Sequence, residues 1–100
     1  MGSYQRGTTV TLEAYFIDER TGNPVTPELT SLSVKVYKDG KVIWDGTSEI
    51  YQLDVGKFAA DFTIPEDAEK GIYVYEWSAT VNNKPVKESA IFRVRTRKGG

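Results

Sequence analysis

The side chains of this chain that could do chemistry are nearly all carboxylates. The 100-residue sequence contains no cysteine and no histidine, so it offers no thiolate nucleophile, no imidazole base and no zinc-ligand set. The acid–base candidates are the acidic residues beside predicted loops: Asp18, Glu19, Asp54, Glu66 and Asp67. We predict no catalytic residue and no cofactor, and a glycosidase built on a carboxylate pair is the least favoured function.

Calcium is the one metal that these carboxylates suggest. Two of them at one end of a domain would offer oxygen ligands, which Ca²⁺ prefers. The spacing Asp-x-Asp-x-Asp of a calcium loop is absent, however. Carboxylates at turns commonly accept hydrogen bonds from the nearby backbone. We therefore predict no metal site and keep calcium as an alternative.

Charge and length exclude two further classes of partner. Thirteen basic and 14 acidic residues give a net charge of −1, which leaves no electrostatic footprint for nucleic acid. One basic cluster is interpreted as a strand end and a solvated tail: Arg93, Arg95, Arg97 and Lys98. No apolar run approaches the roughly 18 residues that span a bilayer. We predict neither nucleic-acid binding nor membrane insertion.

A chain of this length suits one domain with one core. Met1-Gly2-Ser3 resembles a cloning remnant and carries no secretory signal. We expect a disordered or tag-derived segment over residues 1–6, the domain over 7–95 and a flexible tail over 96–100. With no disulfide available, stability must come from the core.

The elements that must hold any site are strands, because apolar residues alternate with period 2 and no helical period appears. Val10, Leu12, Ala14 and Phe16 show this pattern first. Later inner rows are Phe58 to Ile64, Tyr73 to Val81, and Ala90, Phe92 and Val94. About seven strands at short, even spacing predict an all-β sandwich. They cover residues 8–17, 32–37, 41–45, 48–53, 58–64, 72–81 and 86–94.

The hairpin around Asp39-Gly40 has two registers, which place Trp44 on opposite faces. A two-residue loop sets Trp44 beside Lys35 and Tyr37, facing water. A three-residue loop with left-handed Gly40 pairs Val36 with Val42 and Val34 with Trp44. The second register gathers the apolar residues on one face, and burying an indole is favourable, so we predict the three-residue loop.

The segment from Ile64 to Trp77 is typical of a corner between two sheets. A strand ends at Pro65, an acidic turn follows, and Gly71 releases a strand with aromatic residues at every second position. We predict that the hydroxyl of Tyr73 fastens this corner by reaching the backbone around Asp67 and Ala68, as in a tyrosine corner. Tyr75 and Trp77 are expected in the core.

These segments resemble immunoglobulin-like domains of bacterial surface proteins and tailed-phage virions. The matching pieces lie within residues 7–95: Gly7 to Leu12, Gly22 to Pro27, Asp39 to Val42, Gly56 to Phe58, Ile64 to Ala68 and Gly71 to Trp77. The resemblance implies an immunoglobulin-like or fibronectin-III-like Greek-key sandwich of antiparallel strands, without the Cys–Trp–Cys pin of antibody domains. It also implies a structural, adhesive or spacer role and a virion or cell-surface location. Fold likeness alone does not choose among those roles.

The outward residues of one sheet supply the predicted partner site. In an immunoglobulin-like layout, the strands at 32–37, 42–44, 72–81 and 86–94 share a sheet. Its outer face then carries the apolar residues Tyr37, Ile43, Ile72, Val74 and Ile91, whereas the other sheet shows polar residues. Such a patch suits a neighbouring domain or subunit, although exposed Ile and Val also favour strands for their own sake.

We thus predict a non-catalytic structural or protein-interaction module that presents a sheet face and loops to a protein partner. The alternative is a carbohydrate-binding module, with or without calcium; it is weaker because both tryptophans are assigned to the core. An engineered scaffold on the same fold fits the sequence as well.

Overall fold

Thr9–Tyr15 (β2) alternates buried and exposed side chains, Lys57–Thr63 (β6) does so apart from the buried Ala59, and the two strands pair antiparallel. Tyr51–Asp54 (β5) joins the other edge of β6, and the three strands form a sheet in the order β2-β6-β5. The computed structural model describes residues 2–95, and all the following statements concern those residues.

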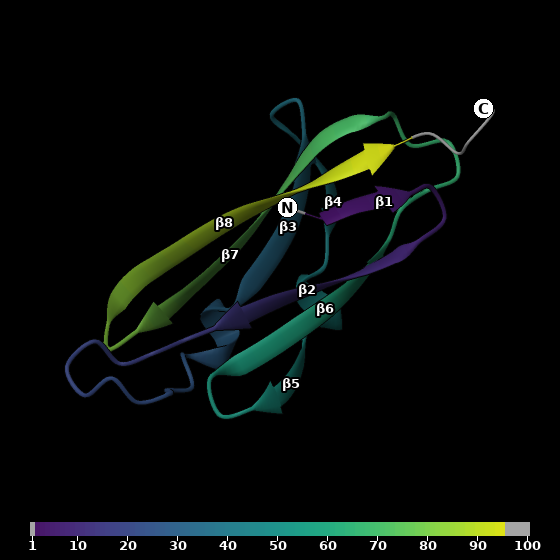
Figure 1. Ribbon diagram of the computed structural model, residues 1–100. Coiled ribbons are helices and arrows are strands. Elements are labelled where there is room, and N and C mark those ends of the chain that lie inside the picture. The colour runs from purple at the N-terminus through teal and green to yellow at the C-terminus, as the bar shows by residue number, and fades with distance from the viewer. Residues whose placement is uncertain (1, 96–100) are drawn as a thin grey trace.

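A larger sheet packs on this one (Figure 1). Its five strands have the order β1-β8-β7-β3-β4. Their bounds are Gly2–Gln5 (β1), Ser33–Lys38 (β3), Lys41–Asp45 (β4), Gly71–Val81 (β7) and Lys84–Arg95 (β8). Two 3₁₀ turns, Leu29–Ser31 and Thr47–Glu49, complete the elements. The predicted all-β sandwich is confirmed, and the strands predicted to share a sheet do so.

β1 was not predicted. We expected residues 1–6 to be disordered or tag-derived, but Gly2–Gln5 pairs with Phe92–Arg95 of β8. The pairing is parallel, so the sandwich is not wholly antiparallel. Tyr4 explains the pairing, since its ring meets that of Phe92 edge-on at 6.1 Å between centroids. The predicted tail at 96–100, including Arg97 and Lys98, lies outside the described residues.

The core consists of the inner rows of the two sheets. Phe92 is its aromatic centre: it stacks on Tyr73 at 5.4 Å and lies 6.2 Å from both Phe62 and Tyr75. Of the predicted inner residues, Tyr75 is only half-buried and Ala90 is exposed. The expectation for Ala90 was wrong because the smaller sheet, whose edge strand is β2, leaves the first half of β8 uncovered.

The predicted hairpin register was also wrong. Lys38 pairs with Lys41 across a two-residue loop, in which Asp39 and Gly40 have φ of 53° and 78°. Tyr37 pairs with Val42 in the same register, and a bulge at Ile43 then shifts it, so that Val36 pairs with Trp44. Trp44 still packs on the core, against Phe62 at 5.1 Å, but Val42 is exposed. The bulge, and not a longer loop, turns the indole inward.

No helix within residues 2–95 has the length and apolar character needed to cross a bilayer.

Candidate interaction surfaces

The larger sheet brings the five predicted partner-binding residues together on its outer face. Val74 of β7 pairs with Tyr37 of β3 on one side and with Ile91 of β8 on the other. Ile72 lies two residues from Val74 on the same face of β7, and Ile43 lies at the β4 bulge. Ile43 and Ile91 are each 45% exposed. We call these residues with Val42 the outer apolar patch: Tyr37, Val42, Ile43, Ile72, Val74 and Ile91.

Val42 was missed by the sequence analysis, which placed it in the core. The pairing of Val42 with Tyr37 puts it on the outer face, where it is 51% exposed. The signal that could have found it is the Asp-Gly pair, which favours a two-residue turn with positive φ at both positions.

Polar side chains border the outer apolar patch. Along β3 and β7, Lys35 pairs with Glu76, and the hydroxyls of Ser33 and Ser78 lie 2.7 Å apart. Ser89 of β8 donates to Glu76 at 3.3 Å. An apolar centre with a polar rim is the usual anatomy of a protein–protein interface.

Tyr73 is part of the scaffold and not of a reactive site. Its buried hydroxyl donates to the carbonyl of Glu69 at 2.6 Å, one residue beyond the predicted acceptors. Arg6 Nε donates to the carbonyl of Ala68, also at 2.6 Å. Burial raises the pKa of Tyr73, which keeps the hydroxyl protonated as a donor. The Tyr73 bond closes the β6–β7 corner on itself, and the Arg6 bond fastens that corner to the chain that leads from β1 to β2.

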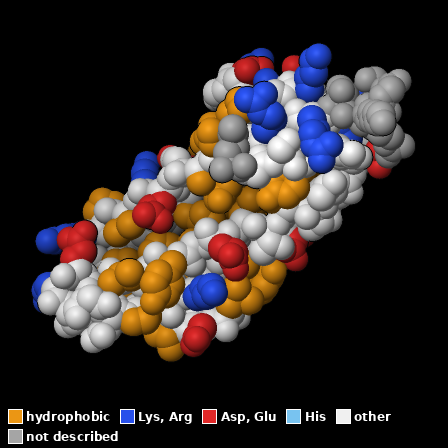
Figure 2. All heavy atoms as spheres, viewed as in Figure 1, with side chains coloured by type: hydrophobic (Ala, Val, Ile, Leu, Met, Phe, Trp, Pro, Cys, Tyr) orange, Lys and Arg blue, Asp and Glu red, His pale blue; other side chains and the backbone are white. Residues whose placement is uncertain are grey.

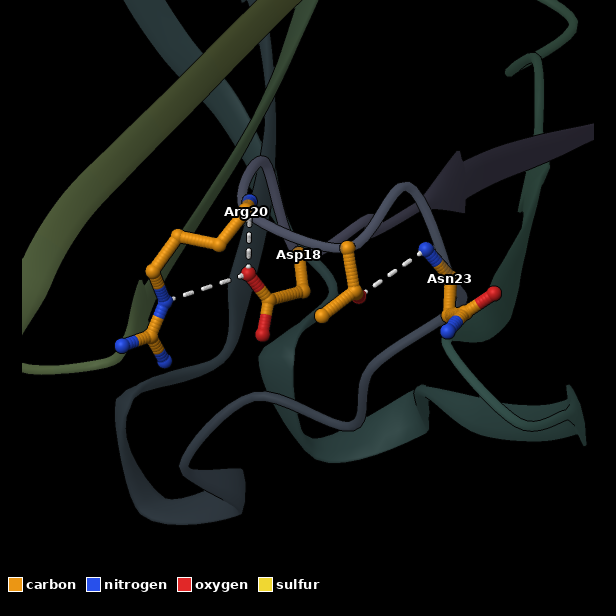
Figure 3. Close-up of polar contacts among 4 residues, drawn as sticks. Asp18, Arg20 and Asn23 are labelled. Carbon is orange, nitrogen blue, oxygen red and sulfur yellow. Dashed lines mark hydrogen bonds and ion pairs between the residues drawn. The ribbon is translucent and has the colours of Figure 1, made fainter.

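The carboxylates proposed for calcium do not converge. Within the described residues there is no group of three or more potential metal-ligating side chains. Asp18 instead holds its own loop (Figure 3), accepting from the backbone of Arg20 at 2.9 Å. That hydrogen bond lowers the pKa of Asp18. Asp54 accepts from the backbone of Val55 at 2.7 Å in the same way.

The outer face of the smaller sheet differs from that of the larger one. Thr11 and Tyr51 both donate to Asp61 Oδ1, at 2.8 and 3.1 Å. Burial is the main cause that raises the pKa of Tyr51, and the hydrogen bond to Asp61 raises it further. Tyr15 is 52% exposed on the same face. The face is therefore mainly polar, with two tyrosines among carboxylates and hydroxyls.

A groove runs between β2 and β8, where the larger sheet extends past the smaller one. Figure 2 shows apolar side chains along the band between these strands. At one end the groove widens into a cavity of about 460 Å³ between the Tyr15–Arg20 segment and the β7–β8 hairpin. Val81, Val86 and Glu88 line it on the β7–β8 side. This cavity was not predicted from the sequence.

Comparisons with known proteins support the fold. No family model matches the chain, and no curated protein does. The chain is similar to part of the X-ray structure of the endo-β-1,4-mannanase from Thermotoga petrophila, with a TM-score of 0.62 and 26% identity. The likeness covers 96% of this chain and 18% of the mannanase chain. This chain thus matches only a small part of that protein.

Proposed function

We propose that this domain is a non-catalytic interaction module that contacts a neighbouring domain or protein through the outer apolar patch. The observation that carries the proposal is the continuity of the patch across four adjacent strands, β4, β3, β7 and β8. Its exposed isoleucines, Ile43, Ile72 and Ile91, gain free energy when a partner removes them from water. The polar rim sets the orientation of that partner.

The resemblance to immunoglobulin-like modules of phage virions and bacterial surfaces supports this role, and we propose such a location for it. The absence of cysteine from the sequence suits a sandwich that relies on its core in place of a disulfide.

Two lysines in the patch test the proposal. The double variant Ile43→Lys with Ile91→Lys places charge at opposite ends of the patch. The control is Leu53→Lys with Val55→Lys, because these residues are similarly exposed, at 47% and 55%, but lie on β5 and its turn. Sedimentation velocity from micromolar to millimolar concentration measures self-association. Titration with the adjoining domain or protein of the native assembly measures binding to it.

Both measurements have a decisive outcome. The patch variant should lose the association, and the control should keep it. A protein that stays monomeric at every concentration, with both double variants binding the native neighbour equally well, would refute the proposal.

A carbohydrate-binding accessory module is the second candidate, because the similar segment belongs to an endo-β-1,4-mannanase. Affinity electrophoresis in β-mannan gels would detect such binding as retarded migration. The calcium-assisted form of this function requires a higher melting temperature in Ca²⁺ than in chelator. Unretarded migration and coincident melting curves would exclude both forms.

A further inference from the structure

The edge of β2 that faces the groove carries unused backbone hydrogen-bonding groups. Ile64 N–H donates to the Thr8 carbonyl at 2.9 Å, and Phe16 N–H donates to the Gly56 carbonyl at 2.8 Å. The ladder between β2 and β6 keeps one register from end to end. Because backbone groups alternate sides along an antiparallel strand, even-numbered residues of β2 bond to β6. The N–H and C=O groups of Thr9, Thr11, Glu13 and Tyr15 point into the groove.

The opposite wall of the groove lacks a covering layer. Val86, Glu88 and Ala90 share the inner face of β8 with Phe92, yet Val86 is half-buried and Glu88 and Ala90 are exposed. Tyr75 lies beside Ala90. Burial raises the pKa of Tyr75, and Tyr4 and Glu13 raise it further. Val86, Ala90 and Tyr75 thus give the groove an apolar floor that Glu88 interrupts, and the edge of β2 is ready to pair.

A second copy of the chain does not suit this space. A second copy that paired its own β2 here would bring its larger sheet against this one, because β8 and β1 extend past β2 in both copies. A single extended strand avoids that collision.

We propose that the groove between β2 and β8 receives one extended strand from a partner protein, antiparallel to β2. The strand becomes a fourth member of the smaller sheet, hydrogen-bonded to Thr9, Thr11, Glu13 and Tyr15. This is strand addition at a sheet edge, in which backbone bonds give affinity and alternate side chains give specificity.

The groove specifies the chemistry of that strand. Its residues opposite Val10, Leu12 and Ala14 point inward and are apolar, because they cover Ala90, Val86 and Tyr75. Its outward residue opposite Glu13 is basic, since opposite charges across a strand pair are favourable. In the antiparallel direction these requirements give the seven-residue segment Thr-Val-Lys-Val-Thr-Val-Thr.

A synthetic peptide of this segment, with blocked ends, is the probe. In an NMR titration of the whole chain, the amide protons of Thr11 and Glu13 should shift saturably and exchange at least ~10-fold more slowly. The amides of Leu12 and Ala14 already bond to β6, so their exchange should hardly change. A peptide whose threonine opposite Thr11 is replaced by proline should not bind, because the backbone N–H at that position donates to β2 and proline has none.

Adjacent positions on β8 supply matched variants. Ala90→Lys puts a charge on the groove wall, and Ser89→Lys puts the same charge on the opposite face of the strand. Both residues are exposed, so both variants should fold. Thr11→Pro removes an edge N–H that β6 does not use. We expect Ala90→Lys and Thr11→Pro to abolish peptide binding and Ser89→Lys to retain it.

Four results would overturn the proposal. One is the absence of saturable shifts at β2 in the wild-type chain. A second is equal binding by the Ala90→Lys and Ser89→Lys variants. The third assigns the groove to another occupant: slow exchange at Thr11 and Glu13 that grows with protein concentration alone points to a second copy. Stabilisation by the same segment fused before Gly2, without binding of the free peptide, points to an upstream part of a longer polypeptide.

Discussion

The two halves of β8 have the same alternation of side chains but different surroundings. Phe92 and Val94 are almost completely buried, whereas Ala90, on the same face, is exposed. At the Phe92–Arg95 end of β8, which we call the closed end, β1 adds an edge strand and the Tyr73 corner lies beside it. At the β7–β8 hairpin, which we call the open end, a cavity remains between the hairpin and the segment that follows β2. Alternation therefore decides which way a side chain points, and the facing layer decides whether it is buried.

The largest expected effect contrasts Phe92 with Ala90. Phe92→Ala removes the ring on which Tyr4, Tyr73 and Phe62 pack, so the free energy of unfolding should fall by about 3–5 kcal/mol. Ala90→Ser, at an exposed position of the same face, should change it by less than about 0.5 kcal/mol. Urea denaturation measures both. Equal losses would show that the two halves of β8 are equally covered.

Tyr73→Phe tests the latch at the closed end. It keeps the ring and removes the hydrogen bond to the Glu69 carbonyl, so we expect a loss of about 0.5–1.5 kcal/mol in the free energy of unfolding. Tyr51→Phe is the control, since its hydroxyl bond to Asp61 is exposed. If urea denaturation gives equal losses for the two variants, the corner bond has no special role.

Trp77 lies between the two ends, paired with Glu88 on β8. Its buried indole N–H has no hydrogen-bond partner in the described structure. Trp77→Phe removes an unsatisfied donor and some packing, and these effects oppose each other. We expect a net loss below about 1.5 kcal/mol in thermal or urea unfolding. A loss as large as that of Phe92→Ala would mean that the indole contributes through packing alone.

The smallest expected effects are changes of stability with pH, which come from Asp18 at the open end and from Tyr73 at the closed end. The pKa of Asp18 lies below its usual 3.8, so its contribution to stability is present above that pH and is lost as pH falls through the lowered pKa. The pKa of Tyr73 lies above 10.0, so its contribution is complete below pH 10 and is lost as pH rises through the raised pKa.

NMR titration follows the Arg20 amide at the open end and the Tyr73 ring at the closed end. A titration midpoint above pH 3.8 for the Asp18 carboxyl, reported by the Arg20 amide, would contradict the hydrogen bond assigned to Asp18. A midpoint below pH 10 for the Tyr73 ring would contradict the burial of its hydroxyl.

The inner rows of β2, β6 and β7 could be predicted because alternation is a local property of the sequence. Phe58 and Trp77, for example, are buried as expected. The parallel pairing of β1 depends instead on a contact between Tyr4 and Phe92, 88 positions apart in the sequence. No pattern within Gly2–Gln5 predicts this parallel pairing.

The candidate site was predictable for a similar reason and only in part. Cross-strand neighbours such as Tyr37, Val74 and Ile91 follow once the sheet order is correct. Val42 was lost because the two-residue turn puts it on the outer face, and only the bulge that follows turns Trp44 inward. The groove could not be predicted, since it arises from the unequal widths of the two sheets.

The pairing of β1 with β8 also determines how the domain would respond to mechanical force. β1 begins the described chain and β8 ends it, and the two strands run parallel over the pairs from Gly2–Phe92 to Gln5–Arg95. A pull on the two termini would slide these strands along each other and load their hydrogen bonds together. An antiparallel terminal pair would open one bond at a time. A four-residue strand thereby gives this small sandwich the geometry of a shear clamp.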